Sequence, residues 1–153
     1  MCSSDLGRPW VTTPTDRSDP GALEAVRQLA EAVGSQPLRC AAEAHDRAVA
    51  LISHLPVVVS AALITAADRG ADGAEGALAR ALASSGFADT SRVGGGNPHL
   101  GALMCRGNRE AVLVALRHYQ RALEELTRAI DAADWQALQE MLQECQALRA
   151  EFL

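Results

Sequence analysis

Hydrophobic positions near the C-terminus recur at steps of three and four residues, which is the period of a helix with one buried face. Between Asn108 and Asp131 they are Val112, Leu116, Tyr119, Leu123, Leu126 and Ile130. This spacing predicts a long helix that packs along another helix at a shallow angle. After Asp134, a suitable helix cap, the spacing repeats at Trp135, Leu138, Leu142, Cys145 and Phe152. The two helices either pack only on each other or also pack on a second molecule, and the pattern leaves both readings open.

The middle of the chain also reads as helix. Apolar residues Val49, Ile52, Val59 and Leu63 share one helical face, but Pro56 interrupts it. Because proline removes one hydrogen bond and its ring clashes with the carbonyl of Ile52, we expect a bend near His54. Beyond this helix we expect a loop over Gly70–Gly76, a short helix over Ala77–Ser84 that is left through Gly86, a turn at the three glycines 94–96, and a further helix that begins at Asn97–Pro98.

The N-terminal part predicts a strand, a helix and a strand. Val11–Thr13 is β-branched, Asp19 can cap a helix with Pro20 at its first position, Gly34 ends that helix, and Gln36–Cys40 forms the returning strand. Two parallel strands cannot form a stable sheet alone, so residues 10–44 read as the end of a larger nucleotide-binding domain. Residues 45–153 then form a helical domain. Residues 1–9 show no pattern, and we expect them to be non-native or disordered.

Composition narrows the class of protein. With 48% hydrophobic and 22% charged residues, the chain is expected to be globular. A net charge of -5 and 3% aromatic residues argue against nucleic-acid binding, which needs a basic face and stacking rings. Four scattered cysteines without a C-x-x-C pair favour reduced thiols and the cytoplasm. No run approaches about 20 apolar residues, so we expect no membrane span.

Three ionisable residues are the candidates for chemistry. His54 lies on the interrupted helix and is either a core histidine or a group beside a ligand. Arg92 carries a planar fork of donors that matches a carboxylate, and Asp89 either forms a structural ion pair with it or orients it. The glycines 94–96 lack the G-x-G-x-x-G pattern between a strand and a helix, so we interpret them as a tight turn or a close approach of the backbone. His99 and Cys105 do not have a zinc spacing, and no metal site is expected.

The motifs WVTTPTD (10–16), HDRAVALISHLP (45–56) and SGFADTSRVGGGNP (85–98) resemble the C-terminal region of the prephenate and arogenate dehydrogenases. The last motif is most similar to the cyanobacterial-type, arogenate-preferring branch. Val57 stands where many relatives have a second histidine, and Ala88 stands where they often have a basic residue. With these departures, both arogenate and prephenate stay open as the substrate.

The resemblance implies a mainly α fold, in which a helical dimerisation domain follows a β-α-β remnant of a Rossmann-type nucleotide-binding domain. It implies oxidative decarboxylation of arogenate or prephenate in tyrosine biosynthesis, with NADP or NAD bound mainly by an N-terminal domain. Arg92 would hold a substrate carboxylate with Asp89 beside it, and His54 would shape the pocket. We find no counterpart of the family's cofactor loop or catalytic histidine in these residues, so none of them is predicted to be catalytic and the chain alone is expected to be inactive.

Two other readings remain open. One is another hydroxyacid dehydrogenase that pairs a Rossmann domain with a helical domain. The other is a helical dimerisation module without catalysis. Under the preferred reading the partners are the small-molecule substrate and a second copy of the chain.

Overall fold

The structure, a computed structural model, describes residues 6–152 and is mainly α-helical. This confirms the predicted fold class. In chain order the elements are β1 (Pro9–Thr12), α1 (Pro20–Ala32), β2 (Gln36–Arg39), α2 (Ala42–Val49), the π-helical turn η1 (Ala50–His54), α3 (Leu55–Arg69), α4 (Gly73–Leu82), α5 (Ser85–Ser91), α6 (Pro98–Gly107), α7 (Arg109–Asp131) and α8 (Trp135–Phe152).

The N-terminal unit is the expected β-α-β arrangement. β1 and β2 pair in parallel with Val11 opposite Leu38, and the Asp19 side chain caps α1 by accepting from the Ala22 N–H at 2.7 Å. The first strand begins at Pro9, two residues before its predicted start. Residues 6–9 are tied to the same unit, because Gly7 N–H donates to the Gly34 carbonyl at 2.7 Å. The remainder of the segment expected to be non-native or disordered, residues 1–5, lies outside the described residues.

Pro56 is accommodated by a change of helix type. Between α2 and α3 the chain makes a π-helical turn, and the Leu55 N–H bonds to the Ala50 carbonyl five residues back. Pro56 then lies in the first turn of α3, directly after this widened turn. The predicted disturbance of the helix near His54 is therefore present as a widened turn.

The joined helix over Ala42–Arg69 is longer and more apolar than we inferred from the sequence. It has 28 residues and is apolar enough to cross a membrane by length and composition alone. Our expectation that no run approaches this length was wrong, because the helix continues through Pro56. Only 11% of the most apolar part of this helix is buried, so an apolar surface stays uncovered.

The region after α3 differs from the prediction in two places. α4 begins at Gly73 and leaves only a short connection, where we expected a loop as far as Gly76. Gly76 packs closely: a Cβ there would lie 2.7 Å from the Ala71 carbonyl oxygen. Gly86 lies inside α5 and does not end a helix. Both glycines were read as breakers, whereas the first serves packing and the second is tolerated within a turn of helix.

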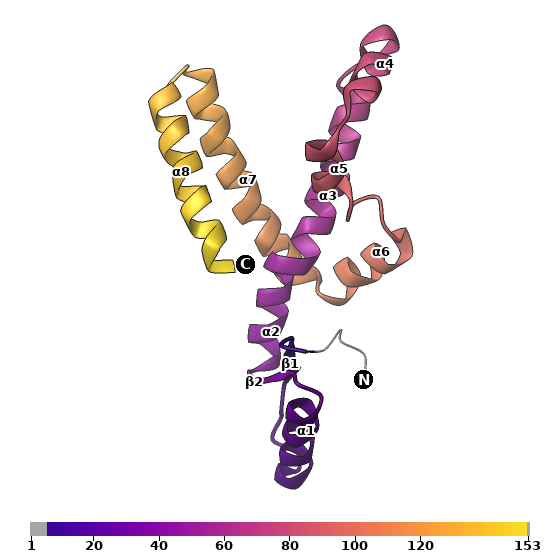
Figure 1. Cartoon of the computed structure of the whole chain (residues 1–153), viewed down its shortest axis with the longest axis vertical. Helices are drawn as coiled ribbons and strands as arrows, with labels where there is room; N and C mark the ends of the chain where they lie inside the picture. The colour runs from indigo at the N-terminus through magenta and orange to yellow at the C-terminus, as the bar shows by residue number, and fades with distance from the viewer. Residues whose placement is uncertain (1–5, 153) are drawn as a thin grey trace.

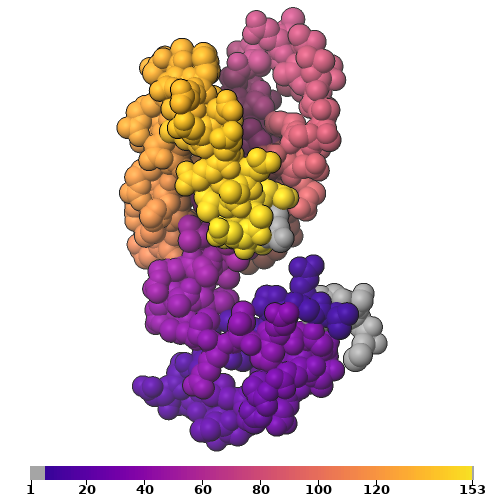
Figure 2. All heavy atoms as spheres, turned by 60° about the vertical axis from the view of Figure 1, so that its left-hand side comes forward, coloured from indigo at the N-terminus to yellow at the C-terminus, as the bar shows by residue number. Residues whose placement is uncertain are grey.

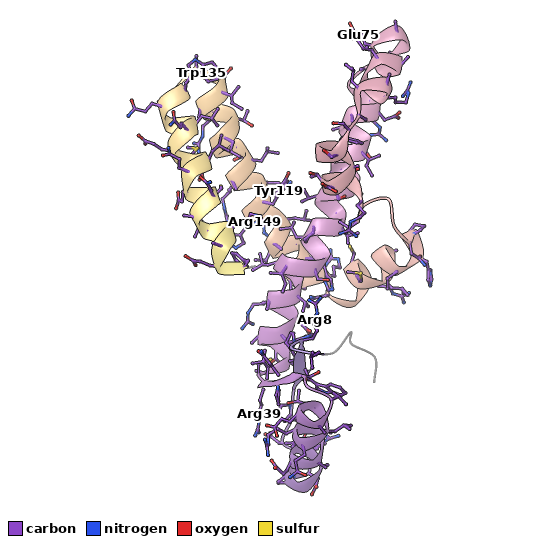
Figure 3. The ribbon with its side chains drawn as sticks, in the orientation of Figure 1. Arg8, Arg39, Glu75, Tyr119, Trp135 and Arg149 are labelled. Atoms are coloured by element: carbon purple, nitrogen blue, oxygen red, sulfur yellow. The ribbon has the colours of Figure 1, made fainter. Side chains whose placement is uncertain are left out.

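The helices form two diverging projections (Figure 1). The arm consists of α3, α4 and α5, and the hairpin consists of α7 and α8. They meet at a base where η1 contacts α6 and α7, around a small core of Ala50, Val112 and Ala115. Trp135 and Glu75 mark the free ends of the hairpin and the arm (Figure 3). The β-α-β unit lies beyond the base as a separate lobe (Figure 2).

Very little of this surface is buried. The buried hydrophobic residues among those described are four alanines and one valine: Ala30, Ala50, Ala115, Ala129 and Val112. The chain exposes 11675 Å², whereas a compact monomer of 16.1 kDa exposes about 7,400 Å². The exposed surface of the helices therefore calls for a covering, either further protein or a lipid phase.

Candidate functional site

Ser60 joins α3 to the segment that carries Arg92. It lies on α3 two turns after His54, and only 2% of its surface is exposed. Its Oγ donates to the Thr90 carbonyl at 2.8 Å and accepts from the Gly94 N–H at 2.8 Å. These two backbone groups lie two residues before and two residues after Arg92. α3 therefore holds the chain on both sides of the arginine.

Gly94 makes possible this pair of Ser60 hydrogen bonds, which we call the Ser60 clamp. A Cβ at this position would lie 2.3 Å from the Ala61 nitrogen and 2.4 Å from the Ser60 carbonyl carbon, both backbone atoms of α3. No side chain fits into that space. The expected close approach of the backbone is therefore present, and it is an approach of Gly94 to α3.

The glycine run has no free N–H group for an anion. Gly94 N–H is bonded to Ser60, Gly95 N–H to the Ser91 carbonyl at 3.2 Å, and Gly96 N–H to the Val93 carbonyl at 3.3 Å. A phosphate loop needs N–H groups that point at the ligand. The run therefore does not fit a nucleotide pyrophosphate.

Arg92 is the first residue after α5, and its side chain is exposed. Asp89, one turn earlier, is also exposed. Among residues 6–152 neither side chain forms an ion pair, so the geometry contains neither a structural Asp89–Arg92 pair nor an orienting contact between them. The guanidinium is consequently available to an anion.

His54 ends the π-helical turn and is half-buried. Its Nδ1 lies 3.4 Å from the Nδ2 of Asn108, which also donates to the Asp46 carbonyl at 2.7 Å. His54 precedes Ser60 by six residues, so along the helix axis the two differ by about 9 Å. One helix thus carries His54 and the anchor of Arg92, although no contact joins His54 to Arg92 or Asp89 in the described part of the chain.

Two cavities adjoin these residues. One of about 300 Å³ lies between α3, the glycine run and α6, and has a mainly apolar lining that includes Val57, Val93 and Cys105. The other, of about 570 Å³, lies between α2 and α7 and is lined by residues that include Asp46, Leu51 and Asn108. Within residues 6–152 no cluster of three His, Cys, Asp or Glu side chains is suitable for a metal ion.

Ser60 and Asn108 were not singled out from the sequence. Ser60 is the only hydroxyl between Val57 and Ile64, and such a residue in an apolar run calls for a polar partner. Asn108 had the position of a helix cap, which concealed its contact with His54. The predicted site residues themselves, His54, Asp89 and Arg92, remain predictions for ligand binding.

Comparisons with known proteins match one family. The family model described as the prephenate dehydrogenase dimerization domain matches residues 41–144. The crystal structure of Synechocystis arogenate dehydrogenase is similar with a TM-score of 0.91 and 44% identity, over 97% of this chain and 53% of that one. A prephenate dehydrogenase from Aquifex aeolicus, solved in complex with hydroxyphenyl propionate and NAD+, is similar with a TM-score of 0.88 and 26% identity, over 97% of this chain and 51% of that one.

A curated relative gives the same result. Cyclohexadienyl dehydrogenase from Zymomonas mobilis is 30% identical over 141 residues, which are 92% of this chain and 48% of the relative. The chain therefore spans about half the length of each of these three relatives.

Proposed function

Since the chain belongs to the prephenate dehydrogenase family, we propose that it is the substrate-side and dimerisation half of an enzyme that oxidatively decarboxylates arogenate or prephenate in tyrosine biosynthesis. The observation that carries this proposal is Arg92, whose side chain is exposed and forms no ion pair with the described residues, on a backbone that Ser60 holds two residues before and two residues after it. A guanidinium that forms no ion pair with the described residues is suited to binding a carboxylate in two parallel hydrogen bonds.

The residues have different roles in this proposal. Arg92 binds and orients a carboxylate of the substrate, and Asp89 contributes to the same surface. His54, on the same helix as the Ser60 clamp, contacts another part of the substrate. The similarity to Synechocystis arogenate dehydrogenase favours arogenate, and Val57 at the position of a second histidine leaves prephenate as the alternative.

The cofactor is assigned to the other half of the enzyme. NADP or NAD accepts the hydride in such a dehydrogenase, and one structural relative was solved with NAD+. The glycine run of this chain does not fit a pyrophosphate, because its N–H groups are bonded within the chain. We therefore propose that the nucleotide is bound mainly by an N-terminal domain, of which the β-α-β unit is the end.

We also propose that the chain forms a homodimer, as the name of the matched family domain suggests. The apolar seam of α7 supports this. Val112 is buried at the base, whereas Leu123 is 48% exposed and Ile130 is 53% exposed, although α8 packs on α7. The hairpin thus covers only part of its own seam, which supports packing on a second copy over the reading that the two helices pack only on each other.

A chimera tests the enzymatic proposal. The corresponding half of Synechocystis arogenate dehydrogenase is replaced by residues 10–153 of this chain, and reduction of NADP and NAD is followed with arogenate and with prephenate. We expect turnover by the chimera and none by the chain alone. A chimera that folds and binds nucleotide but oxidises neither substrate would exclude the proposed activity and favour another hydroxyacid dehydrogenase or a dimerisation module.

A further inference from the structure

Asn108 occupies the cap position of α7 without capping it. Its backbone carbonyl begins the helix by accepting from the Val112 N–H, but its side chain forms no bond to the N–H groups of the first turn. An asparagine at this position usually stabilises a helix by about 1 kcal/mol through such a bond. Here the side chain instead crosses to a helix more than fifty residues earlier in the chain.

The contact with Asp46 fixes which way the amide points. A backbone carbonyl can only accept, so the amide atom 2.7 Å from the Asp46 oxygen must be Nδ2, which donates. Nδ2 carries two hydrogens, and one of them is used in this bond. The second is left for His54, whose Nδ1 lies 3.4 Å away.

This donor decides the tautomer of the histidine. An N–H donates to a lone pair, so the Nδ1 atom of neutral His54 must be unprotonated where Nδ2 points at it. The single proton of the neutral ring then lies on Nε2. The π-helical turn fixes the backbone of His54, and turns of this kind are frequent at functional sites. The π-helical turn thus fixes the backbone of His54, and the Asn108 side chain fixes its ring.

We propose that Asn108 is a positioning residue that holds neutral His54 as the Nε2–H tautomer, so that His54 presents a hydrogen-bond donor to its ligand. The inference deepens the proposed function and rests on it for the identity of that ligand. Carboxylate, carbonyl and hydroxyl oxygens of an arogenate- or prephenate-like substrate accept such a bond. A ring with Nδ1–H and a bare Nε2 would face the same oxygens with a lone pair.

Nitrogen NMR of the unmodified chain tests the tautomer directly. Long-range proton–nitrogen spectra of the 15N-labelled protein distinguish a protonated from an unprotonated ring nitrogen, and a His54→Gln variant identifies the resonances among those of the four histidines. At a pH where the ring is neutral in these spectra, we expect Nε2 protonated and Nδ1 bare. A predominant Nδ1–H form would overturn the inference without any variant.

Asn108→Asp makes the test specific. Aspartate has the same size but only accepts, so it cannot donate to the Asp46 carbonyl or to a bare Nδ1 of His54, and the ring should change to the Nδ1–H tautomer, whose N–H can donate to the carboxylate. Asn97→Asp is the matched control, because Asn97 caps α6 by accepting from the His99 and Leu100 N–H groups, which a carboxylate also does. The control should leave His54 unchanged. If a folded Asn108→Asp protein keeps the Nε2–H form, Asn108 does not set the tautomer.

Asn108→Ala, which adds no charge, should give a mixture of the two tautomers. An unchanged Nε2–H signal in this variant would also count against the inference.

Kinetics of the chimera separate this inference from the proposed function. Asn108→Asp should raise the Michaelis constant for the substrate and leave that for the nucleotide unchanged. If the tautomer reverses while neither Arg92→Ala nor His54→Gln affects the substrate, the proposed substrate site fails and the positioning role stands. If Arg92→Ala weakens substrate binding but the tautomer never changes, the positioning role fails alone.

Discussion

At the scale of single residues, two small residues fix the backbone that carries Arg92. Ser60 supplies one hydroxyl that bonds the backbone on either side of the arginine, and Gly94 lets that backbone approach α3. Neither residue carries a charge that could bind an anion. Their effect is to fix the backbone that carries Arg92 before a ligand arrives, which lowers the backbone entropy lost on binding.

Removing the guanidinium should weaken substrate binding. A hydrogen bond to a charged group is worth about 1.5–3 kcal/mol, so Arg92→Ala in the chimera should raise the Michaelis constant roughly 10- to 150-fold. Arg92→Lys should recover only part of this, because an ammonium keeps the charge but loses the fork. Steady-state kinetics give the Michaelis constant, and a thermal melt of each variant serves as control. A lowered melting temperature with normal kinetics would mean that Arg92 is structural.

The close approach of Gly94 gives a test with a built-in control. Gly94→Ala places a methyl group 2.3 Å from a backbone atom and should destabilise the fold by about 1–3 kcal/mol. Gly86→Ala lies inside α5 with no atom within 4 Å, and should stabilise by about 0.5–1 kcal/mol. Urea unfolding of both variants measures the difference. A Gly94→Ala variant as stable as the unmodified chain would show that the clamp does not constrain the chain.

At the scale of elements, the helices differ in how far their own packing supports them. α1 is reinforced on its surface, where the Arg27 side chain bonds Glu24 and lowers the pKa of that carboxyl to about 2. Such exposed pairs contribute little to stability. The two strands beside α1 have four residues each and no further neighbours among the described elements. The β-α-β unit is thus the least supported part of the molecule.

Hydrogen exchange should reveal this difference. Amides of β1 and β2 should exchange rapidly, because a two-stranded sheet opens easily, while the middle of α7 should be protected. Mass spectrometry or NMR of the isolated chain measures both regions in one experiment. Protection of Val11 and Leu38 equal to that of Ala115 would indicate that the chain is stable as it stands, without a further domain on its sheet.

Several elements were predictable because local chemistry determines them. Asp19 with Pro20, Asn97 with Pro98, and Asp134 each begin a helix as expected, and each carboxyl or amide oxygen accepts from the following N–H groups. The α7 seam followed from its spacing. Gly76 and Gly86 were misread, because a glycine that serves close packing has the same letter as one that ends a helix.

The site was less accessible to sequence reasoning than the fold. His54, Asp89 and Arg92 were chosen from residue types and a resemblance, whereas the contacts that position two of them are long-range. Ser60 meets Gly94 34 residues later, and Asn108 meets His54 54 residues earlier. No periodicity encodes such pairs. They depend on how α3, α5 and α7 pack, which only the folded chain reveals.

At the scale of the whole molecule, the exposed surface calls for a covering. The chain exposes about 4,000 Å² more than a compact monomer of its mass would, and obligate homodimer interfaces bury about 2,000–5,000 Å² in total. The excess includes the apolar helix over Ala42–Arg69, the arm and the hairpin. A second copy can cover these faces, and a nucleotide-binding domain on the small sheet would cover the rest.

Charge placed on the open part of the α7 seam should separate the two copies. Leu123 suits this test better than Leu116, because Leu116 packs against the core of its own chain. We expect the unmodified chain to sediment as a dimer at tens of micromolar and Leu123→Glu to sediment as a folded monomer, since the interface would have to bury an unpaired carboxylate. Gln120→Glu adds the same charge at an exposed polar position beside the seam and should stay dimeric.

The alternative covering is a lipid phase, and the same samples decide between the two. Flotation with phosphatidylcholine vesicles should leave the unmodified chain in the dense fraction as a dimer, because its apolar faces are already paired. A chain that sediments as a monomer without lipid and floats with the vesicles would contradict the homodimer. It would assign the apolar helix over Ala42–Arg69 to a membrane, since that helix passes the length and composition test for a span.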